Sequence, residues 1–383
     1  MTASRHRMLG RLILGQVCIH ACMAGTRMAA PLLALREGYS AASVGVLLAL
    51  YALTQVFLSL PAGRYADRHG LKRPIAFSVI AATAGAGLAA AFPIFPVLCF
   101  SALCTGGATG AASIALQRHV GRAATSSAEL RQVFSWLAIG PAMSNFIGPF
   151  AAGLVIDHAG FRQAFFLMAL LPLAAWFFVR TVEELAPVVR AAHHGKTRAW
   201  DLLQDPMFRR LLLVNWFLSS CWDVHTFVVP VLGHERGISA SVIGTILGAF
   251  AIAAAAIRVA LPLVAAHVRE WVMVTGSMAA TAVLFGIYPF MHSAVAMGAC
   301  SVLLGFSLGV VQPMIMSTLH QITPEHRHGE AVAMRLMAIN ASSVAMPMLF
   351  GLTGAVIGIA GVFWVVGVVV AGGTRLAWRL GET

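Results

Sequence analysis

The chain alternates between long apolar segments and short polar interruptions. Each apolar segment has roughly 20 residues, the length that a helix needs to cross about 30 Å of hydrocarbon. The pattern predicts an all-α integral membrane protein with twelve transmembrane helices. The predicted spans are residues 10–35, 42–63, 74–91, 94–117, 130–156, 161–180, 208–232, 240–266, 271–291, 294–320, 330–357 and 361–378.

The longest polar interruption lies between the sixth and the seventh span. It predicts an N-terminal six-helix bundle over residues 1–180, a cytoplasmic linker over 181–207 and a C-terminal six-helix bundle over 208–383. This interruption leaves six predicted spans on each side of it, so it is interpreted as the linker between the two halves.

The two halves also resemble each other in sequence. "YSAASVGVLLALYAL" at 39–53 aligns with "ISASVIGTILGAFAI" at 238–252, an offset of 199 residues, and "GLVIDHAGF" aligns with "GAVIGIAGV" at an offset of 201. A repeat near half the chain length is typical of transporters built from two related units, with the binding site between them.

Composition and charge agree with a membrane protein. Only 10% of the residues are charged and the mean hydropathy is +0.83, whereas soluble domains have about 25% charged residues. The net charge of +12 comes from bases spread over short loops, which argues against a nucleic-acid partner. Of the 26 lysines and arginines, 20 lie on one side of the predicted spans, so both termini are predicted to be cytoplasmic. The other six are Arg36, Arg162 and Arg236 on the opposite side and Arg27, Arg258 and Arg335 within spans.

The loop between the second and third spans reads "GRYADRHGLKR" over residues 63–73. It resembles the signature G-x-x-x-D-R-x-G-R-[KR] of the major facilitator superfamily, with Leu71 in place of a usual arginine. The matching residues are Gly63, Asp67, Arg68, Gly70, Lys72 and Arg73. The twelve spans and the half-repeat also resemble that family, so the resemblance covers nearly the whole chain.

The resemblance implies the fold of the family, two six-helix bundles with pseudo-two-fold symmetry, in a bacterial inner membrane. It also implies a gating role for Gly63, Asp67, Arg68, Gly70 and Arg73. In the family the aspartate latches the cytoplasmic side shut, with arginines as partners. The alternative interpretation is an ordinary basic loop of the kind found on the cytoplasmic side of membrane proteins.

The fifth span contains "GPAMSNFIGPFAAG" over residues 140–153. It resembles the antiporter motif of the family, with one residue fewer after the first glycine, and the resemblance implies export in exchange for protons. The matching residues are Gly140, Gly148, Pro149 and Gly153. The alternative is a helix–helix packing seam of small residues. In the fourth span Ala102 stands where proton-coupled drug antiporters have an arginine.

Four charged residues lie well inside predicted spans, away from the span ends: Arg27, Asp223, Arg258 and Arg335. Each costs about 2.5–3.5 kcal/mol at the centre of a membrane helix, so we expect them to face a cavity. Three arginines against one aspartate favour an anionic or amphipathic substrate. Asp223 is the candidate proton-coupling site, and a structural ion pair with an arginine is the alternative. The further candidate substrate contacts, which could equally be packing residues, are Gln55, Asn145, Trp222 and Gln312.

These features predict a monomeric secondary transporter that exports a small organic molecule by alternating access. The proton gradient is the expected driving force, and no cofactor or metal is expected. The alternatives are a proton-coupled importer, a membrane sensor that transports nothing, and a lipid-handling protein on the same fold. The sequence has no P-loop, HExxH or G-x-S-x-G motif, which argues against an enzyme.

Overall fold

A computed structural model describes residues 3–123, 137, 139–184, 199–265, 269–323 and 328–381. Every regular element in these ranges is a helix, which confirms the predicted all-α class. Eleven helical segments there have the length and hydropathy needed to cross a membrane. α6 (Ile139–Ala159) occupies the position of the fifth predicted span, whose first residues lie outside the described part.

The chain forms two compact units. Unit 1 comprises Met1–Arg190 and Gly237–Gly248, and unit 2 comprises Ala191–Arg236 and Ala249–Thr383. The first two and a half turns of α9, up to Gly248, therefore belong to unit 1. Residues 185–198 of the predicted linker lie outside the described residues, so the predicted domain boundaries stay a prediction.

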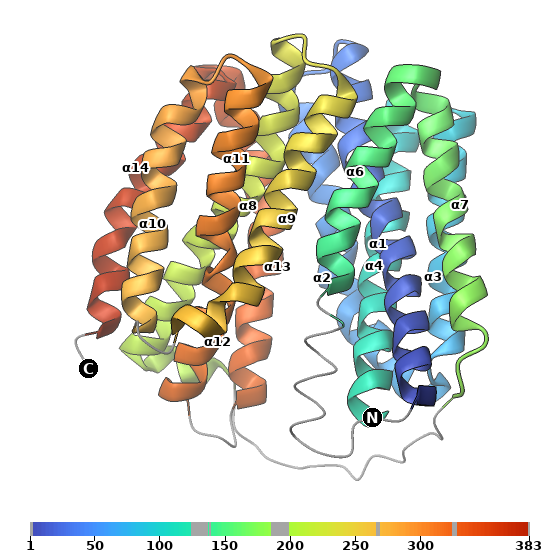
Figure 1. Cartoon of the computed structure of the whole chain (residues 1–383), viewed down its shortest axis with the longest axis horizontal. Helices are drawn as coiled ribbons and strands as arrows, with labels where there is room; N and C mark the ends of the chain where they lie inside the picture. Colours follow the sequence, from blue (N-terminus) through green and yellow to red (C-terminus); the bar gives the residue numbers. More distant parts are fainter. Residues whose placement is uncertain are drawn as a thin grey trace. The chain divides into compact units, whose positions relative to one another are not determined.

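The described part of unit 1 contains six long helices that run side by side (Figure 1). They are α1 (Ala3–Arg36), α2 (Ala41–His69), α3 (Lys72–Ala91), α4 (Phe95–Ala123), α6 and α7 (Phe161–Val179). α1 packs against α6 and α7, while α4 packs against α2 and α3. One cluster of buried side chains, including Leu12, Leu71, Leu116 and Val179, joins α1, α3, α4 and α7.

Unit 2 is built around α8, which packs against α13 and α14, and α14 in turn packs against α10 (Figure 1). Its long helices are α8 (Pro206–Glu235), the later turns of α9 (Ala240–Ala265), α10 (Glu270–Ile287), α11 (Ala294–Gly309), α12 (Val311–Ile322), α13 (His328–Ile357) and α14 (Ile359–Trp378). The short 3₁₀ helices η1 (Ala199–Gln204), η2 (Tyr288–Phe290) and η4 (Arg379–Gly381) complete it.

Local sequence signals explain where several helices begin. Ser40, Asp205 and Ser293 accept backbone N–H bonds at the first turns of α2, α8 and α11, and each thereby satisfies a donor that the helix leaves unpaired. α2 and α9 begin at Ala41 and Ala240, 199 positions apart, as the first repeat predicts. α7 and α14 begin 198 positions apart, so the structural register of the second repeat differs by three residues from the predicted offset of 201.

The tenth predicted span, 294–320, is divided into α11 and α12 at Val310. Pro313, in the first turn of α12, has no N–H to donate to the carbonyl four residues earlier, and its ring crowds that carbonyl. The carbonyl concerned is that of Gly309. A continuous helix was predicted because the hydropathy of the segment is uniform, but the proline breaks it.

Candidate functional site

Trp222 and Arg258 lie together in unit 2. The guanidinium carbon of Arg258 on α9 is 5.9 Å from the ring centroid of Trp222 on α8, within cation–π range. Arg258 Nε donates a hydrogen bond to the carbonyl oxygen of Gly309, 3.1 Å away. This is the carbonyl that Pro313 leaves without its helical partner. The proline break in α11–α12 therefore provides the acceptor that positions Arg258 beside Trp222.

Phe250 connects this pair to a buried polar chain. Its ring meets Trp222 edge-on, with the centroids 4.5 Å apart, and stacks on His225 at 4.0 Å. His225 Nε2 lies 2.9 Å from the Ser301 hydroxyl, which lies 2.8 Å from the Tyr288 hydroxyl. Because His225 is fully buried in these contacts, it packs the interior of unit 2.

Asp223 is 5% exposed and points toward α13. The Ser343 hydroxyl lies 3.4 Å from each carboxylate oxygen, a long contact for a hydrogen bond. Asp223 is therefore a buried carboxylate that contacts α13.

Arg335 and Gln312 differ in their surroundings. Arg335 is 5% exposed, and its Nε donates a 3.1 Å hydrogen bond to Asn215 Oδ1 across the α8–α13 contact. Gln312 is exposed on α12. Arg335 is therefore a buried interhelical contact in this structure, while the side chain of Gln312 is accessible.

The unit 1 candidates lie on three helices. Arg27 on α1 and Asn145 on α6 are half-buried. Gln55 on α2 donates a 3.4 Å hydrogen bond to the Tyr51 carbonyl oxygen and packs against Gly110 of α4. Gln55 thus helps to join α2 to α4, which favours the packing alternative for this residue.

The glycines of the span-5 motif lie at close approaches between helices. A Cβ added at Gly148 would lie 2.5 Å from the Ala21 carbonyl oxygen of α1, and one at Gly140 would lie 2.7 Å from Gln16 Oε1. A Cβ at Gly153 would meet the Ala240 carbonyl at the start of α9, and the Pro149 carbonyl fills the space above Gly244. These residues therefore form a packing seam that joins α6 to α1 and to the first turns of α9.

The loop at residues 63–73 connects α2 to α3. Gly70 has a φ of +76°, a conformation that disfavours residues with a side chain. Arg68 and Arg73 are exposed, and Gly63 faces Ile114 of α4 with room to spare. The side chain of Asp67 lies outside the described residues, so its gating role stays a prediction.

Leu71, which stands at the usual arginine position, is 1% exposed in the core of unit 1. Beside it, Glu184 Oε1 accepts hydrogen bonds from the backbone N–H groups of Leu71 and Lys72, at 3.0 and 2.9 Å. A carboxylate here is also favoured by the dipole of α3. Leu71, which replaces the arginine of the family pattern, therefore packs the loop into the core of unit 1. Glu184, which lies outside the motif, holds the loop by hydrogen bonds to its backbone.

The sequence profile of the Major Facilitator Superfamily matches residues 12–319 and 211–382 of the chain. The chain belongs to this superfamily. It is therefore an integral membrane transporter rather than an enzyme, as predicted.

One curated MFS relative is the multidrug resistance protein MdtG of Yersinia enterocolitica. It is 24% identical over 243 residues, which cover 61% of this chain and 58% of MdtG. The chain thus aligns with little more than half the length of that relative.

Solved transporter structures share the fold. A bacterial homologue of the human lysosomal transporter Spinster matches with a TM-score of 0.82 at 12% identity, covering 100% of this chain and 98% of that one. A POT family transporter in complex with a thioalcohol-conjugated peptide gives 0.80 at 14% identity, covering 98% and 96%. The nucleoside transporter NupG, as a mutant, gives 0.73 at 14% identity, covering 98% and 99%. At these identities the likeness shows the fold alone.

Sequence reasoning missed Asp157, which lies just beyond the predicted end of the fifth span. Its two carboxylate oxygens accept hydrogen bonds from the backbone N–H groups of Ala240 and Ser241, at 3.1 and 2.8 Å. Partial burial raises the pKa of Asp157, but the hydrogen bonds from Ser241 and Ala240 outweigh it and hold the pKa below the ordinary 3.8. Asp157 is therefore ionised at neutral pH and fastens the start of α9 to the end of α6.

Proposed function

We propose that this MFS transporter exports a small anionic or amphipathic molecule in exchange for protons, by alternating access. The supporting observation is the arrangement on α8. Asp223 is buried and contacts the Ser343 hydroxyl, while the guanidinium of Arg258 lies over the ring of the adjacent Trp222. A carboxylate able to change protonation next to a cation–aromatic contact combines a proton site with a place for an anion.

One comparison supports export over import, since the aligned relative MdtG is named for multidrug resistance. We also propose that the protein lies in a bacterial inner membrane, because the relative MdtG is bacterial. Both termini are proposed to be in the cytoplasm, because most lysines and arginines lie on that side of the predicted spans.

Proton exchange is tested in proteoliposomes that enclose a pH-sensitive dye. Candidate anions and amphipathic molecules are added outside in the absence of any other gradient. Antiport carries protons out as the substrate enters, so the interior becomes alkaline. Symport acidifies the interior, and a sensor leaves the pH unchanged. The sign of the pH change does not depend on the orientation of the reconstituted protein.

Asp223→Asn should abolish the alkaline shift while the protein remains folded. Asp201→Asn is the matched control, since Asp201 is exposed on η1, outside the spans. An alkaline shift of equal rate in Asp223→Asn and in the wild type would remove Asp223 as the coupling site. An acid shift in the wild type would establish the importer instead.

A further inference from the structure

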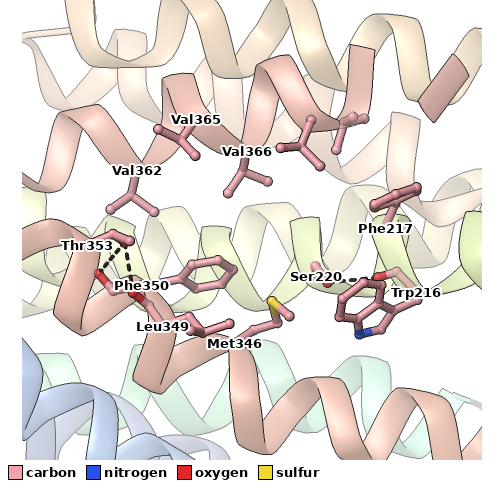
Figure 2. A pocket seen from close by; sticks show the side chains of 12 residues that line it. Trp216, Phe217, Ser220, Met346, Leu349, Phe350, Thr353, Val362, Val365 and Val366 are labelled. Carbon is pink, nitrogen blue, oxygen red and sulfur yellow. Dashed lines mark hydrogen bonds between the residues drawn. The ribbon is translucent and has the colours of Figure 1, made fainter. Parts of the chain in front are cut away.

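Unit 2 contains an apolar pocket between α8, α13 and α14, apart from the residues considered above. Its cavity volume is about 270 Å³, slightly below the roughly 300–1,000 Å³ of drug-sized ligand sites. Figure 2 shows Val362, Val365 and Val366 of α14 on one side of the pocket and Phe350 and Met346 of α13 on the other. Trp216 and Ser220 of α8 close the end of the pocket.

The pocket has a buried floor and an exposed rim. Val362, Phe350 and Val370 are at most 5% exposed, whereas Leu349, Val365 and Val369 are 47–49% exposed. In a membrane-spanning segment such exposed apolar side chains contact hydrocarbon. The pocket is therefore continuous with the lipid-facing surface, and whatever fills it enters from the bilayer with an apolar part.

A pair of hydroxyls connects the pocket to the Asp223 site. The two hydroxyl groups in the lining, those of Thr353 and Ser220, each donate a hydrogen bond to a carbonyl oxygen of their own helix. The Ser220 hydroxyl lies 3.1 Å from that of Ser342 on α13. Ser342 is followed by Ser343, which contacts Asp223, and Asp223 lies three residues after Ser220. The same stretch of the α8–α13 contact thus forms the end of the pocket and holds the candidate coupling group.

We propose that the pocket binds the alkyl chain of an amphipathic substrate that reaches the protein from the bilayer. This inference rests on the proposed transport function and narrows its substrate to molecules with an alkyl chain as well as a polar head. A chain in the pocket would place the molecule against the α8–α13 contact, within one helical turn of Asp223 along α8.

Trp216 provides the measurement, because bromine quenches tryptophan fluorescence at short range. The probe is an undecyl sulfonate with a terminal bromine, added to protein in bilayers, and methanesulfonate is the control that has the head alone. We expect saturable quenching by the long probe. Saturable quenching should be absent in Trp216→Phe, because the seven other tryptophans of that variant do not line the pocket.

Val366→Phe fills the pocket and should abolish the saturable quenching. Val368→Phe adds the same bulk to α14 at a position that is 72% exposed and outside the lining, so quenching should persist. Met346→Phe is a second filling variant, used if Val366→Phe does not fold.

Equal quenching in the wild type and in Trp216→Phe would overturn the proposal, as would quenching that neither filling variant reduces. Saturable quenching by a phosphatidylcholine with brominated chains, not displaced by the sulfonate, would make the pocket a lipid site and would equally overturn it. Proton movement in the dye-loaded liposomes reports separately on the transport function. The absence of proton movement together with pocket-specific quenching would refute the proposed proton exchange and leave the binding site intact.

Discussion

Gly148→Ala tests whether the span-5 motif acts through close backbone packing. The added Cβ would lie 2.5 Å from the Ala21 carbonyl oxygen and 2.8 Å from the Gly25 nitrogen. Both obstacles are backbone atoms of α1, which cannot rotate away. Real Cβ atoms essentially never approach closer than 3.0 Å, so α1 and α6 must separate by at least 0.5 Å. Overpacking of this kind costs about 1–3 kcal/mol.

Gly87→Ala is the matched control, since Gly87 lies inside α3 and a Cβ there meets nothing within 4 Å. Both variants gain the same helix propensity, about 0.8–1 kcal/mol in favour of alanine, so their difference isolates the clash. For units of this size, 1 kcal/mol shifts Tm by about 2–4 °C. Gly148→Ala should therefore melt about 2–12 °C below Gly87→Ala in a fluorescence-detected thermal denaturation. Equal melting temperatures would refute the packing explanation of the motif.

Three further changes have defined outcomes. Pro313→Ala restores the helical N–H donor to the Gly309 carbonyl, so it should raise Tm and slow proton exchange. An unchanged rate of proton exchange would show that transport does not need the helix break at Val310. Asp157→Asn should lower stability at neutral pH by about 0.3–1 kcal/mol, and its melting temperature should converge with that of the wild type as acid protonates Asp157. A constant gap at all pH values would contradict the charge–helix explanation. Asn215→Ala leaves the Arg335 guanidinium without its acceptor and should cost about 1–3 kcal/mol, measured by thermal denaturation, whereas a neutral effect would show that solvent replaces the amide.

The helical architecture is the part that the sequence predicts best, for a physical reason. Hydrocarbon offers no partners to backbone N–H and C=O groups, so an apolar segment of span length has to form a helix. Hydropathy therefore predicts where the described helices lie, although α1 begins seven residues before its predicted start and α2 and α4 end six residues after their predicted ends. The loop at 63–73 identifies the family. The break at Val310 depends on a single proline that an average over the segment does not register.

The polar contacts of the candidate site were less predictable because their partners are distant in the chain. The acceptor for Arg258 is the carbonyl of Gly309, 51 residues away, and a backbone carbonyl has no signal in a list of side chains. Ser343 lies 120 residues from Asp223. Charge inside a span shows that a partner is needed, but only the packing of the helices determines which residue provides it.

Asp157 and Glu184 show how unit 1 uses carboxylates outside the spans. Each accepts two backbone N–H bonds at the first turn of a helix, Asp157 from α9 and Glu184 from α3. The two residues lie at opposite ends of α7 along the chain, so they hold opposite ends of the unit. A helix start leaves its N–H groups unpaired and partially positive, and an acid from a neighbouring helix satisfies them at little cost in conformational freedom. Because such contacts contribute only about 0.3–1 kcal/mol each, they can form and break with a change of conformation. The backbone-close packing of Gly148 against α1 cannot adjust in this way, so α6 and α1 would stay joined in a moving transporter, whereas the contact of Glu184 with the start of α3 could open and close.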